Sequence, residues 1–339
     1  MALYGKTMRS DHSFCCVNVS DALYLIKQSI EENGVRVETR NGPALEFPNP
    51  CIITYNNPKE RVMFYPERDA NPIFHFMESM WMLDGRKDLH FIKRFNKQME
   101  QYSNDKHTVS GAYGYRWRSY FARDQFETVI HRLKRYPNDR RTVLSMWDPV
   151  HDLRQDNESK DLPCNTHIYF YIRNNMLDMT VCNRSNDLIW GACGANAVHM
   201  SFLQEYIATM VGIDVGTYTQ FSNNLHAYDV TLKKLEGMQP DYDSYASRNF
   251  TTLPPLIDDI KTFDNELTLW LQHRAVSKDW TNSIFANVAQ PMLQTWNAWK
   301  DKDWKKAYAN AERIGSDDWC VATLEWLNRR KDLFNGSKV

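Results

Sequence analysis

Two strand-like segments joined by a tight turn constrain this chain more than any other feature. Residues 166–173 and 177–183 are rich in β-branched and aromatic side chains, and Arg173-Asn174-Asn175 joins them as a predicted hairpin. Cys164 stands just before the first strand, and Arg184 directly follows the second. The pattern couples a candidate nucleophile to a candidate anion site, which suits covalent attack on an anionic small substrate.

The overall composition is that of an ordinary globular protein. Of 339 residues, 42% are hydrophobic and 24% are charged. The formal net charge of −1, from 41 basic and 42 acidic residues, gives no reason to expect nucleic acid or an anionic membrane as a partner. No apolar run reaches the length of a membrane span, and the N-terminus lacks the apolar core of a signal peptide. We therefore expect a cytoplasmic protein.

The cysteines predict free thiols. Their number, seven, is odd, and they are dispersed without a Cys-x-x-Cys pair, which favours a reducing compartment over a disulfide framework. Cys164 and His167 alone are too few ligands for a metal site, so no metal is expected.

Apolar periodicity and capping residues place the other elements. Ser20 or Asp21 is predicted to cap a helix that runs to about residue 32 and ends at Gly34. Further helices are predicted at residues 72–83, 90–102 and 196–210, and strands at residues 51–55, 62–65, 142–147 and 218–221.

The composition changes near residue 238. A turn-rich link is followed by amphipathic helical patterns at residues 264–275, 288–300, 303–313 and 317–331. We therefore predict a catalytic domain over residues 1–238 and a helical C-terminal extension of unknown role over residues 239–339. The many tryptophans of the extension are interpreted as packing residues.

The surroundings of Cys164 carry a family resemblance. A cysteine that follows a proline, with Arg184-Ser185-Asn186-Asp187 twenty residues on, resembles the thymidylate synthase family, which includes the pyrimidine nucleotide hydroxymethylases. The resemblance covers residues 18–235. It implies an α+β fold with a large mixed twisted sheet flanked by helices, and an obligate homodimer.

Four arginines resemble the phosphate site of that family. Arg140 and Arg141 resemble the paired arginines that reach the phosphate of the neighbouring subunit's substrate. Arg40 resembles the arginine of the mobile loop that closes over the same phosphate, and Arg184 with Ser185 completes the site. Four guanidinium groups can neutralise a dianionic phosphate through charge-assisted, bidentate hydrogen bonds.

The resemblance also assigns the nucleoside contacts. His226 and Tyr228 resemble the His-x-Tyr motif that binds the 3′-hydroxyl of the sugar, and Asn196, thirty residues earlier, takes the base-reading position. An amide can donate to a carbonyl and accept from a ring N–H, which suits uracil, so dUMP is favoured over dCMP. Counting forward from Arg184 without a gap would place Ala195 there, but the helix register favours Asn196.

Further residues are assigned to proton transfer and to the folate. Glu78 lies on an otherwise apolar helix, where a carboxylate is costly unless it is paired or working, and it suits proton transfer. The resemblance places Tyr113 near the proton that leaves carbon 5. It assigns Asp187 to the pterin ring, with Gly191 at the same cofactor site, although a lone Asp at a strand end is more commonly a cap.

The resemblance implies a covalent mechanism with 5,10-methylenetetrahydrofolate. The Cys164 thiolate adds to carbon 6, and carbon 5 attacks the methylene of the folate. Loss of the carbon-5 proton and of tetrahydrofolate then leaves an exocyclic methylene. Hydride then gives thymidylate, whereas water gives the 5-hydroxymethyl nucleotide. The tryptophan that shields the methylene in synthases is replaced near Met99, and Asn165 stands where a histidine usually follows the nucleophile. A looser shield favours hydroxymethylation of dUMP, which is typical of phage enzymes; methylation of dUMP and hydroxymethylation of dCMP stay open.

Two rival interpretations belong to other classes. A non-catalytic nucleotide-binding protein would predict a missing nucleophile or a broken phosphate set, and neither is seen. A cysteine protease using Cys164 with His226 or His199 would lack an evident orienting Asn or Asp.

Overall fold

The computed structural model describes residues 12–154, 159–240, 244–273 and 279–336. Its strands are β1 (Ser13–Cys16), β2 (Val35–Thr39), β3 (Gly42–Glu46), β4 (Cys51–Tyr55), β5 (Val143–Ser145), β6 (Asn165–Arg173), β7 (Met176–Asn183), β8 (Asn186–Asp187), β9 (Asp214–Ser222) and β10 (Leu225–Tyr228).

The α-helices are α1 (Val19–Asn33), α2 (Pro72–Leu83), α3 (Leu89–Ile92), α4 (Tyr113–Tyr115), α5 (Gln125–Arg135), α6 (Asn196–Val211), α7 (Asp229–Leu232), α8 (Phe263–His273), α9 (Gln290–Lys300), α10 (Trp304–Ala311) and α11 (Asp317–Gly336). Short 3₁₀ helices are η1 (Pro66–Arg68), η2 (Lys97–Tyr102) and η5 (Lys233–Leu235), and π-helices are η3 (Arg116–Tyr120), η4 (Leu188–Ala195) and η6 (Phe285–Ala289).

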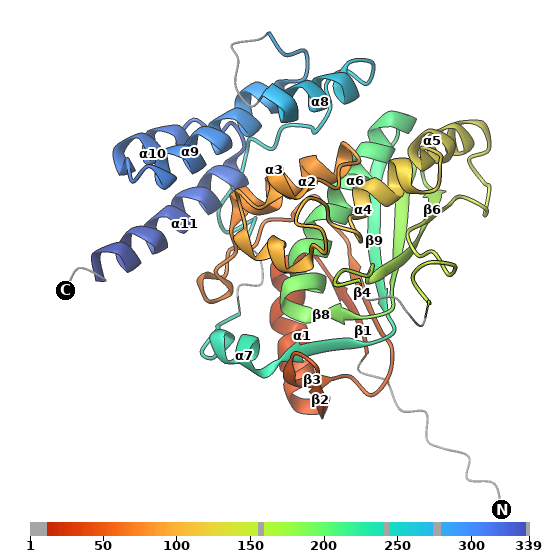
Figure 1. Cartoon of the computed structure of the whole chain (residues 1–339), viewed down its shortest axis with the longest axis horizontal. Coiled ribbons are helices and arrows are strands. Elements are labelled where there is room, and N and C mark those ends of the chain that lie inside the picture. The colour runs from red at the N-terminus through yellow and green to blue at the C-terminus, as the bar shows by residue number, and fades with distance from the viewer. Residues whose placement is uncertain (1–11, 155–158, 241–243, 274–278, 337–339) are drawn as a thin grey trace, which may run out of the picture.

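A mixed six-stranded sheet, in the order β1-β4-β9-β7-β6-β5, forms the centre of the fold (Figure 1). The predicted β6–β7 hairpin is confirmed: Arg173 pairs with Met176, and both turn residues between them have positive φ, as the favoured two-residue hairpin turn requires. Near the open end, Asn165 pairs with Asn183 and His167 with Cys182, so Thr166 is an extra residue in β6 and forms a β-bulge.

The two faces of this sheet differ in what covers them. One row of paired positions is buried against the helices, and it consists of Leu144, Ile168, Val181, Gln220 and Ile53. The adjacent row is exposed or half-buried on the opposite face, and it consists of Val143, Tyr169, Thr180, Thr219, Thr54 and Cys15. The mixed sheet with helices confirms the predicted α+β class.

A second sheet, in the order β2-β3-β10-β8, brings distant segments to the site. It lies at the lower edge of Figure 1, where the β2–β3 turn carries Arg40. In the parallel β10–β8 pair, His226 stands opposite Asp187.

Two buried helices supply the floor of the site. Asn71 caps α2 by accepting from the Phe74 N–H, and Pro72 occupies its first turn, where a missing N–H costs nothing. Nearly every residue of α2 and α6 is buried, so the polar side chains of both helices, including Glu78 and Asn196, are enclosed.

The C-terminal helices α8 to α11 form a layer on the outer side of α2 and α3 (Figure 1). Trp319 packs edge-on against Phe76 of α2, with ring centroids 5.5 Å apart. Asp264 of α8 accepts hydrogen bonds from Arg118 and Tyr206. The hydrophobic core therefore runs without interruption from the sheet into the C-terminal helices. Trp296, Trp319 and Trp326 are buried, as predicted for packing residues.

Three local predictions were wrong. The helix near the N-terminus is capped by Asn18, whose side chain accepts from the N–H groups of the two residues expected to cap it. The pattern over residues 90–102 forms α3 and then η2, because the Asn96 side chain accepts from the Gln98 N–H and starts a separate turn. Residues 62–65 are buried in the core but pair with no strand.

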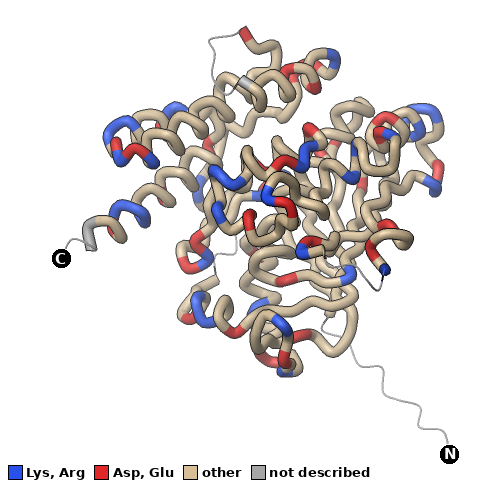
Figure 2. The backbone as a smooth tube through the Cα atoms, viewed as in Figure 1, with Lys and Arg blue, Asp and Glu red and all other residues tan. Residues whose placement is uncertain are grey.

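Charges of both signs are interspersed along the chain in the view of Figure 2. Within the described residues, no helix is long and apolar enough to span a membrane.

Candidate active site

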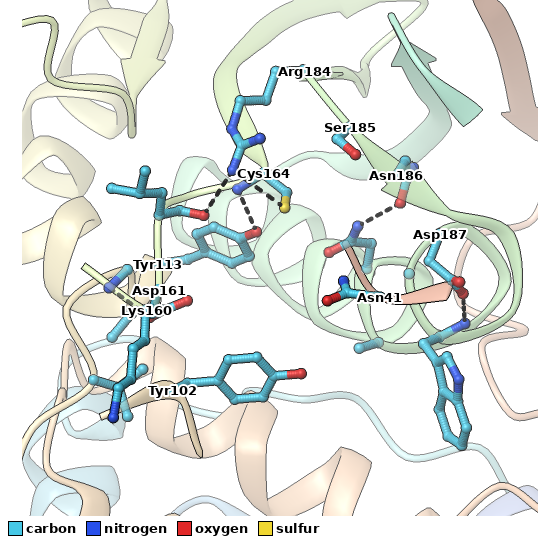
Figure 3. Close-up of a pocket in the computed structure, with 18 of the residues that line it drawn as sticks. Asn41, Tyr102, Tyr113, Lys160, Asp161, Cys164, Arg184, Ser185, Asn186 and Asp187 are labelled. Carbon is cyan, nitrogen blue, oxygen red and sulfur yellow. Dashed lines mark hydrogen bonds between the residues drawn. The ribbon is translucent and has the colours of Figure 1, made fainter. Parts of the chain in front are cut away.

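A pocket of about 770 Å³ opens between the two sheets, α2 and α6. Eleven of the residues that the sequence assigned to a site line it: Arg40, Glu78, Tyr113, Cys164, Arg184, Ser185, Asp187, Gly191, Asn196, His226 and Tyr228. Figure 3 shows Cys164 and Tyr113 across the pocket from Asn186 and Asp187. Its volume suits a small ligand held by a few convergent polar groups.

Cys164 lies at the open end of the β6–β7 hairpin, beside Arg184. The Arg184 N–H donates to the Cys164 carbonyl (2.9 Å), and Arg184 Nη2 lies 3.8 Å from the Cys164 sulfur. The guanidinium also donates to the carbonyls of Leu162 and Pro163, so the arginine holds the segment that carries Cys164.

The thiol of Cys164 is protonated before a ligand arrives. Burial raises its pKa above the ordinary cysteine value and outweighs the opposing effect of Arg184, while the Asp161 carboxylate raises the pKa further and Arg40 lowers it. The expected positive charge is therefore present, but it does not by itself produce a thiolate. Deprotonation of the sulfur has to accompany binding of the substrate.

The four predicted phosphate arginines divide into two pairs. Arg184 and Arg40 line the pocket, and Arg40 lies on the exposed β2–β3 turn, where the Asn41 amide donates to the Tyr228 hydroxyl (3.2 Å). Arg140 and Arg141 lie on the exposed turn before β5, outside the pocket of their own chain.

Asn196 begins α6, directly after the π-helix η4. Its amide donates to Asn186 Oδ1 (3.0 Å) and accepts from the Asn165 amide (3.3 Å). The preceding segment is kinked at Cys193 and Gly194, whose backbone angles are not helical, so a gapless count from Arg184 does not follow a regular helix up to Asn196. Ala195 also lines the pocket but has no side-chain polar group.

His226 and Tyr228 come from alternate positions of β10, so both face the pocket. The Nδ1 atom of His226 lies 2.8 Å from Asn224 Oδ1, and its ring packs edge-on against Tyr228. Burial lowers the pKa of His226, with Asp187 opposing this effect, which favours a neutral ring at physiological pH.

Glu78 is 5% exposed, so its carboxylate is enclosed within the protein. Its Oε2 atom lies 3.1 Å from Nε2 of His199, which is also buried and lines the pocket. His199 stands one turn beyond Asn196 on α6. The two helices thus present a carboxylate–imidazole pair to the pocket.

Asp187 caps a helix with one carboxylate oxygen and lines the pocket. Its Oδ1 atom caps η4 by accepting from the N–H groups of Ile189 and Trp190. Its Oδ2 atom is buried and has no hydrogen-bond partner within the described residues. Burial raises its pKa. An unpaired acceptor in a pocket wall suits a ligand that presents N–H groups.

Asp161 is a half-buried carboxylate near Cys164. It accepts from the Gly111 N–H (2.6 Å), and a side chain at position 111 would collide with it, because a Cβ there would lie 2.7 Å from Oδ2. In Figure 3 its carboxylate lies between the rings of Tyr113 and Tyr102. Burial raises the pKa of Asp161 to about 6.

The Tyr113 hydroxyl accepts from the N–H groups of Cys164 and Asn165. Burial raises the pKa of Tyr113, so its hydroxyl stays protonated. Met99 and Tyr102 of η2 line the same region of the pocket, where the shielding tryptophan was expected to be replaced.

No role was predicted for Asp161, Asn186 or Gln220, and His199 was considered only as a possible protease residue. The i, i+3 spacing from Asn196 was an available signal for His199. The protease interpretation lacks a Cys–His pair: among the described residues, the imidazoles of His199 and His226 pair with Glu78 and Asn224. In the same residues, no three His, Cys, Asp or Glu side chains converge as a metal site requires.

Comparisons with known proteins identify the class to which this fold and pocket belong. A model of the thymidylate synthase family matches residues 23–267, which is most of the chain and includes the link and the beginning of α8. The chain belongs to the thymidylate synthase family.

Two of the relatives come from phages and share a name. A deoxyuridylate hydroxymethyltransferase of Pseudomonas phage M6 is 42% identical over 337 residues, covering 95% of each chain. A protein of the same name from Bacillus phage SP01 is 31% identical over 309 residues, covering 88% of this chain and 80% of its own length. The first alignment must therefore include most of the C-terminal helices.

An archaeal relative is shorter. A putative thymidylate synthase of Methanothermobacter marburgensis is 36% identical over 217 residues, covering 64% of this chain and 92% of its own length. About a third of the present chain thus has no aligned counterpart in that protein.

Proposed function

We propose that this protein transfers a one-carbon unit to carbon 5 of dUMP and releases 5-hydroxymethyl-dUMP, with 5,10-methylenetetrahydrofolate as co-substrate. One observation carries the proposal. The Cys164 sulfur lies 3.8 Å from Arg184 Nη2 in the wall of a pocket that is also lined by Asn196. The phage relatives named deoxyuridylate hydroxymethyltransferase support the product and the base.

In this proposal the nucleotide phosphate binds at Arg184, Ser185 and Arg40, which share one side of the pocket. The sugar lies against His226 and Tyr228. The base then lies over Cys164 with its polar edge toward Asn196, where the amide offers both a donor and an acceptor.

The chemistry follows from this placement. The Cys164 sulfur bonds to carbon 6 of the pyrimidine, and electron density moves to carbon 5, which becomes nucleophilic. Glu78, with His199 beside it, takes up and returns protons at the base. Protonated Tyr113 holds the two backbone N–H groups next to the nucleophile and so fixes its position.

The residues present fit the folate. The unpaired Asp187 Oδ2 is an acceptor for the N–H groups of a pterin ring, and Trp190, which is 49% exposed, also lines the pocket. When bound, 5,10-methylenetetrahydrofolate supplies the carbon that becomes the substituent on carbon 5.

The hydroxymethyl product requires water at the methylene on carbon 5. The oxygen of water bonds to that methylene, its proton passes to a base, and the electrons released at carbon 5 re-form the ring double bond as the carbon 6–sulfur bond breaks. Asp161 suits the role of base, because its carboxylate lines the pocket near Cys164 and its pKa is raised to about 6 by burial.

The proposal includes a homodimer. The uncovered row of the large sheet carries apolar side chains, of which Tyr169 is 46% and Val143 is 36% exposed. A second copy covering this face would bury that apolar surface. Arg140 lies at the edge of the face, just before β5, and with Arg141 it would reach the partner's phosphate site.

We further propose that residues 239–339 are a helical extension that supports α2 from behind. The Phe76–Trp319 packing supports this role, since Phe76 stands two residues before Glu78. The phage sources of the relatives support a phage origin, with action in the cytoplasm of the host.

Purified protein given dUMP and 5,10-methylenetetrahydrofolate is expected to form 5-hydroxymethyl-dUMP and tetrahydrofolate, identified by mass spectrometry. A parallel reaction with dCMP is expected to be much slower. Thymidylate with dihydrofolate would contradict the product and leave the family chemistry intact. Absence of any product from both nucleotides would contradict catalysis.

Asp161→Asn is expected to lower the rate of hydroxymethyl product formation by roughly 10²-fold, because the base is lost. In the unchanged protein the Asp161 carboxyl is mostly protonated below pH 6 and mostly ionised above it, so the rate should rise with pH through about 6. The variant should lack that rise. Product formation is measured by mass spectrometry at pH values from about 5 to about 8, because folded proteins are generally most stable in this range.

Asp318→Asn is the matched control, since Asp318 is a buried aspartate that also has a raised pKa but lies in α11. It should retain both the rate and the pH profile. An unchanged profile in Asp161→Asn would exclude this carboxylate as the base.

A further inference from the structure

We propose that Gln220 sets the base specificity of the pocket by fixing the orientation of the Asn196 amide through Asn186. Gln220 acts here as a positioning residue that does not touch the substrate. The inference rests on the proposed function, because it concerns how the same pocket tells uracil from cytosine.

The network of amide hydrogen bonds starts at the backbone carbonyl of Ala192, which can only accept hydrogen bonds. Gln220 Nε2 donates to the backbone carbonyl of Ala192 (2.8 Å), and the Tyr55 hydroxyl donates to the same carbonyl (2.7 Å). A carbonyl oxygen only accepts hydrogen bonds, so the NH₂ group of Gln220 must face it. The Oε1 atom of Gln220 then faces the opposite way.

The orientation of Gln220 determines the orientation of Asn186, which in turn determines that of Asn196. Gln220 Oε1 accepts from Asn186 Nδ2 (2.9 Å), and Ser222 Oγ accepts from the same group (3.0 Å). Asn186 Oδ1 is thereby directed at Asn196 Nδ2, 3.0 Å away, a bond drawn in Figure 3. Asn196 Oδ1 in turn accepts from the Asn165 amide.

The fixed Asn196 amide matches uracil. After its bonds to Asn186 and Asn165, it keeps one N–H donor and one acceptor position on Oδ1 for a ligand. Uracil presents a ring N–H and a carbonyl oxygen, which need an acceptor and a donor. Cytosine presents the reverse pair, a ring nitrogen acceptor and an amino donor, and requires the amide to turn over.

Turning Asn196 over would set like atoms against each other. Its oxygen would face Asn186 Oδ1, whose orientation is held by the bonds of Asn186 Nδ2 to Gln220 and Ser222. Gln220 and Asn165 are fully buried and Asn186 is 2% exposed, so water cannot relieve the mismatch. Gly191 packs so closely against Asn186 that no side chain would fit there, because a Cβ at position 191 would lie 2.4 Å from Asn186 Oδ1.

The test replaces Gln220 with leucine, which removes the anchored amide and leaves Asn186 free to turn. The ratio of kcat/KM for dUMP over dCMP is expected to fall at least about tenfold, the size of effect expected when one buried hydrogen-bonding constraint is lost. Gln204→Leu is the matched control. Gln204 is an equally buried amide in the middle of α6 that donates to the backbone carbonyls of Leu177 and Thr217, and its loss should leave the ratio unchanged.

Asn186→Ser provides a second route if Gln220→Leu does not fold, because it removes the acceptor that holds Asn196 Nδ2. The dissociation constants of dUMP and dCMP, measured by calorimetry, give a readout that does not depend on turnover. A lower preference for dUMP in both assays would support the relay.

The outcomes separate the two proposals. If the unchanged protein prefers dUMP and both variants keep its ratio, the relay is wrong and the proposed function stands. If no product forms but the binding preference shifts as expected, the relay stands without the proposed function. Preference of the unchanged protein for dCMP, or binding of neither nucleotide, would overturn the relay.

Discussion

Replacing Cys164 with serine is expected to lower the rate of one-carbon transfer by roughly 10⁴-fold or more, the usual cost of removing a catalytic nucleophile. A serine hydroxyl is far less acidic than a thiol, and the buried position that raises the pKa of Cys164 disfavours an alkoxide still more. Turnover is measured by mass spectrometry of the nucleotide product. Binding of dUMP, measured by calorimetry, should change little, because Arg184 and Asn196 keep their bonds to other groups.

Cys320→Ser is the matched control, since this half-buried thiol in α11 donates to a backbone carbonyl, which a serine can also do. It should retain full activity. Substantial turnover by Cys164→Ser would exclude the covalent mechanism, whereas inactivity of both variants would indicate a general sensitivity of the fold to loss of cysteine.

Glu78→Gln is expected to lower the rate by roughly 10²- to 10⁴-fold, the range typical of a lost general acid or base. Glutamine keeps the shape of the side chain but cannot take up a proton, so the effect should fall on turnover and leave the dissociation constant of dUMP nearly unchanged. Release of the hydrogen on carbon 5, followed with isotopically labelled dUMP, reports the affected step directly.

Glu266→Gln controls for loss of a buried carboxylate. Glu266 is 6% exposed, close to the 5% of Glu78, but it lies in α8 and accepts from residues 281 and 282. Its replacement should affect thermal stability and leave kcat unchanged. Equal rates for Glu78→Gln and the unchanged protein would remove Glu78 from the mechanism.

Local signals account for the parts of the site that could be predicted from the sequence. The hairpin was predictable because strand composition and the Asn174-Asn175 turn are both local, and it brings Cys164 beside Arg184. The burial of Glu78 was predictable because most neighbouring positions on its helix are apolar.

Groups that meet only in the folded chain could not be predicted in this way. Gln220 lies on the buried face of β9, and nothing near it in sequence indicates that Ala192 and Asn186 supply its partners. The carboxylate of Asp161 is held by Gly111, fifty residues earlier, so its place in the pocket carries no local pattern.

Short apolar runs are ambiguous for a related reason. Residues 62–65 have the composition of a strand, but a strand also needs a neighbour with free backbone groups, and burial alone satisfied their side chains. Conversely, the helical pattern over residues 90–102 failed because a side chain–backbone bond at Asn96 competes with continued helix.

The bulge at Thr166 explains how Cys164 and Arg184 can face each other although they are an even number of positions apart. Across a two-residue turn, residues that face each other are always an odd number of positions apart, as Arg173 and Met176 are. Cys164 and Arg184 are twenty positions apart, an even number, and can be neighbours only because one strand holds one residue more than the other. If the regular pairing continued without a bulge, Asn165 in place of Cys164 would stand opposite Arg184. The one extra residue in β6 therefore decides which side chain stands opposite Arg184.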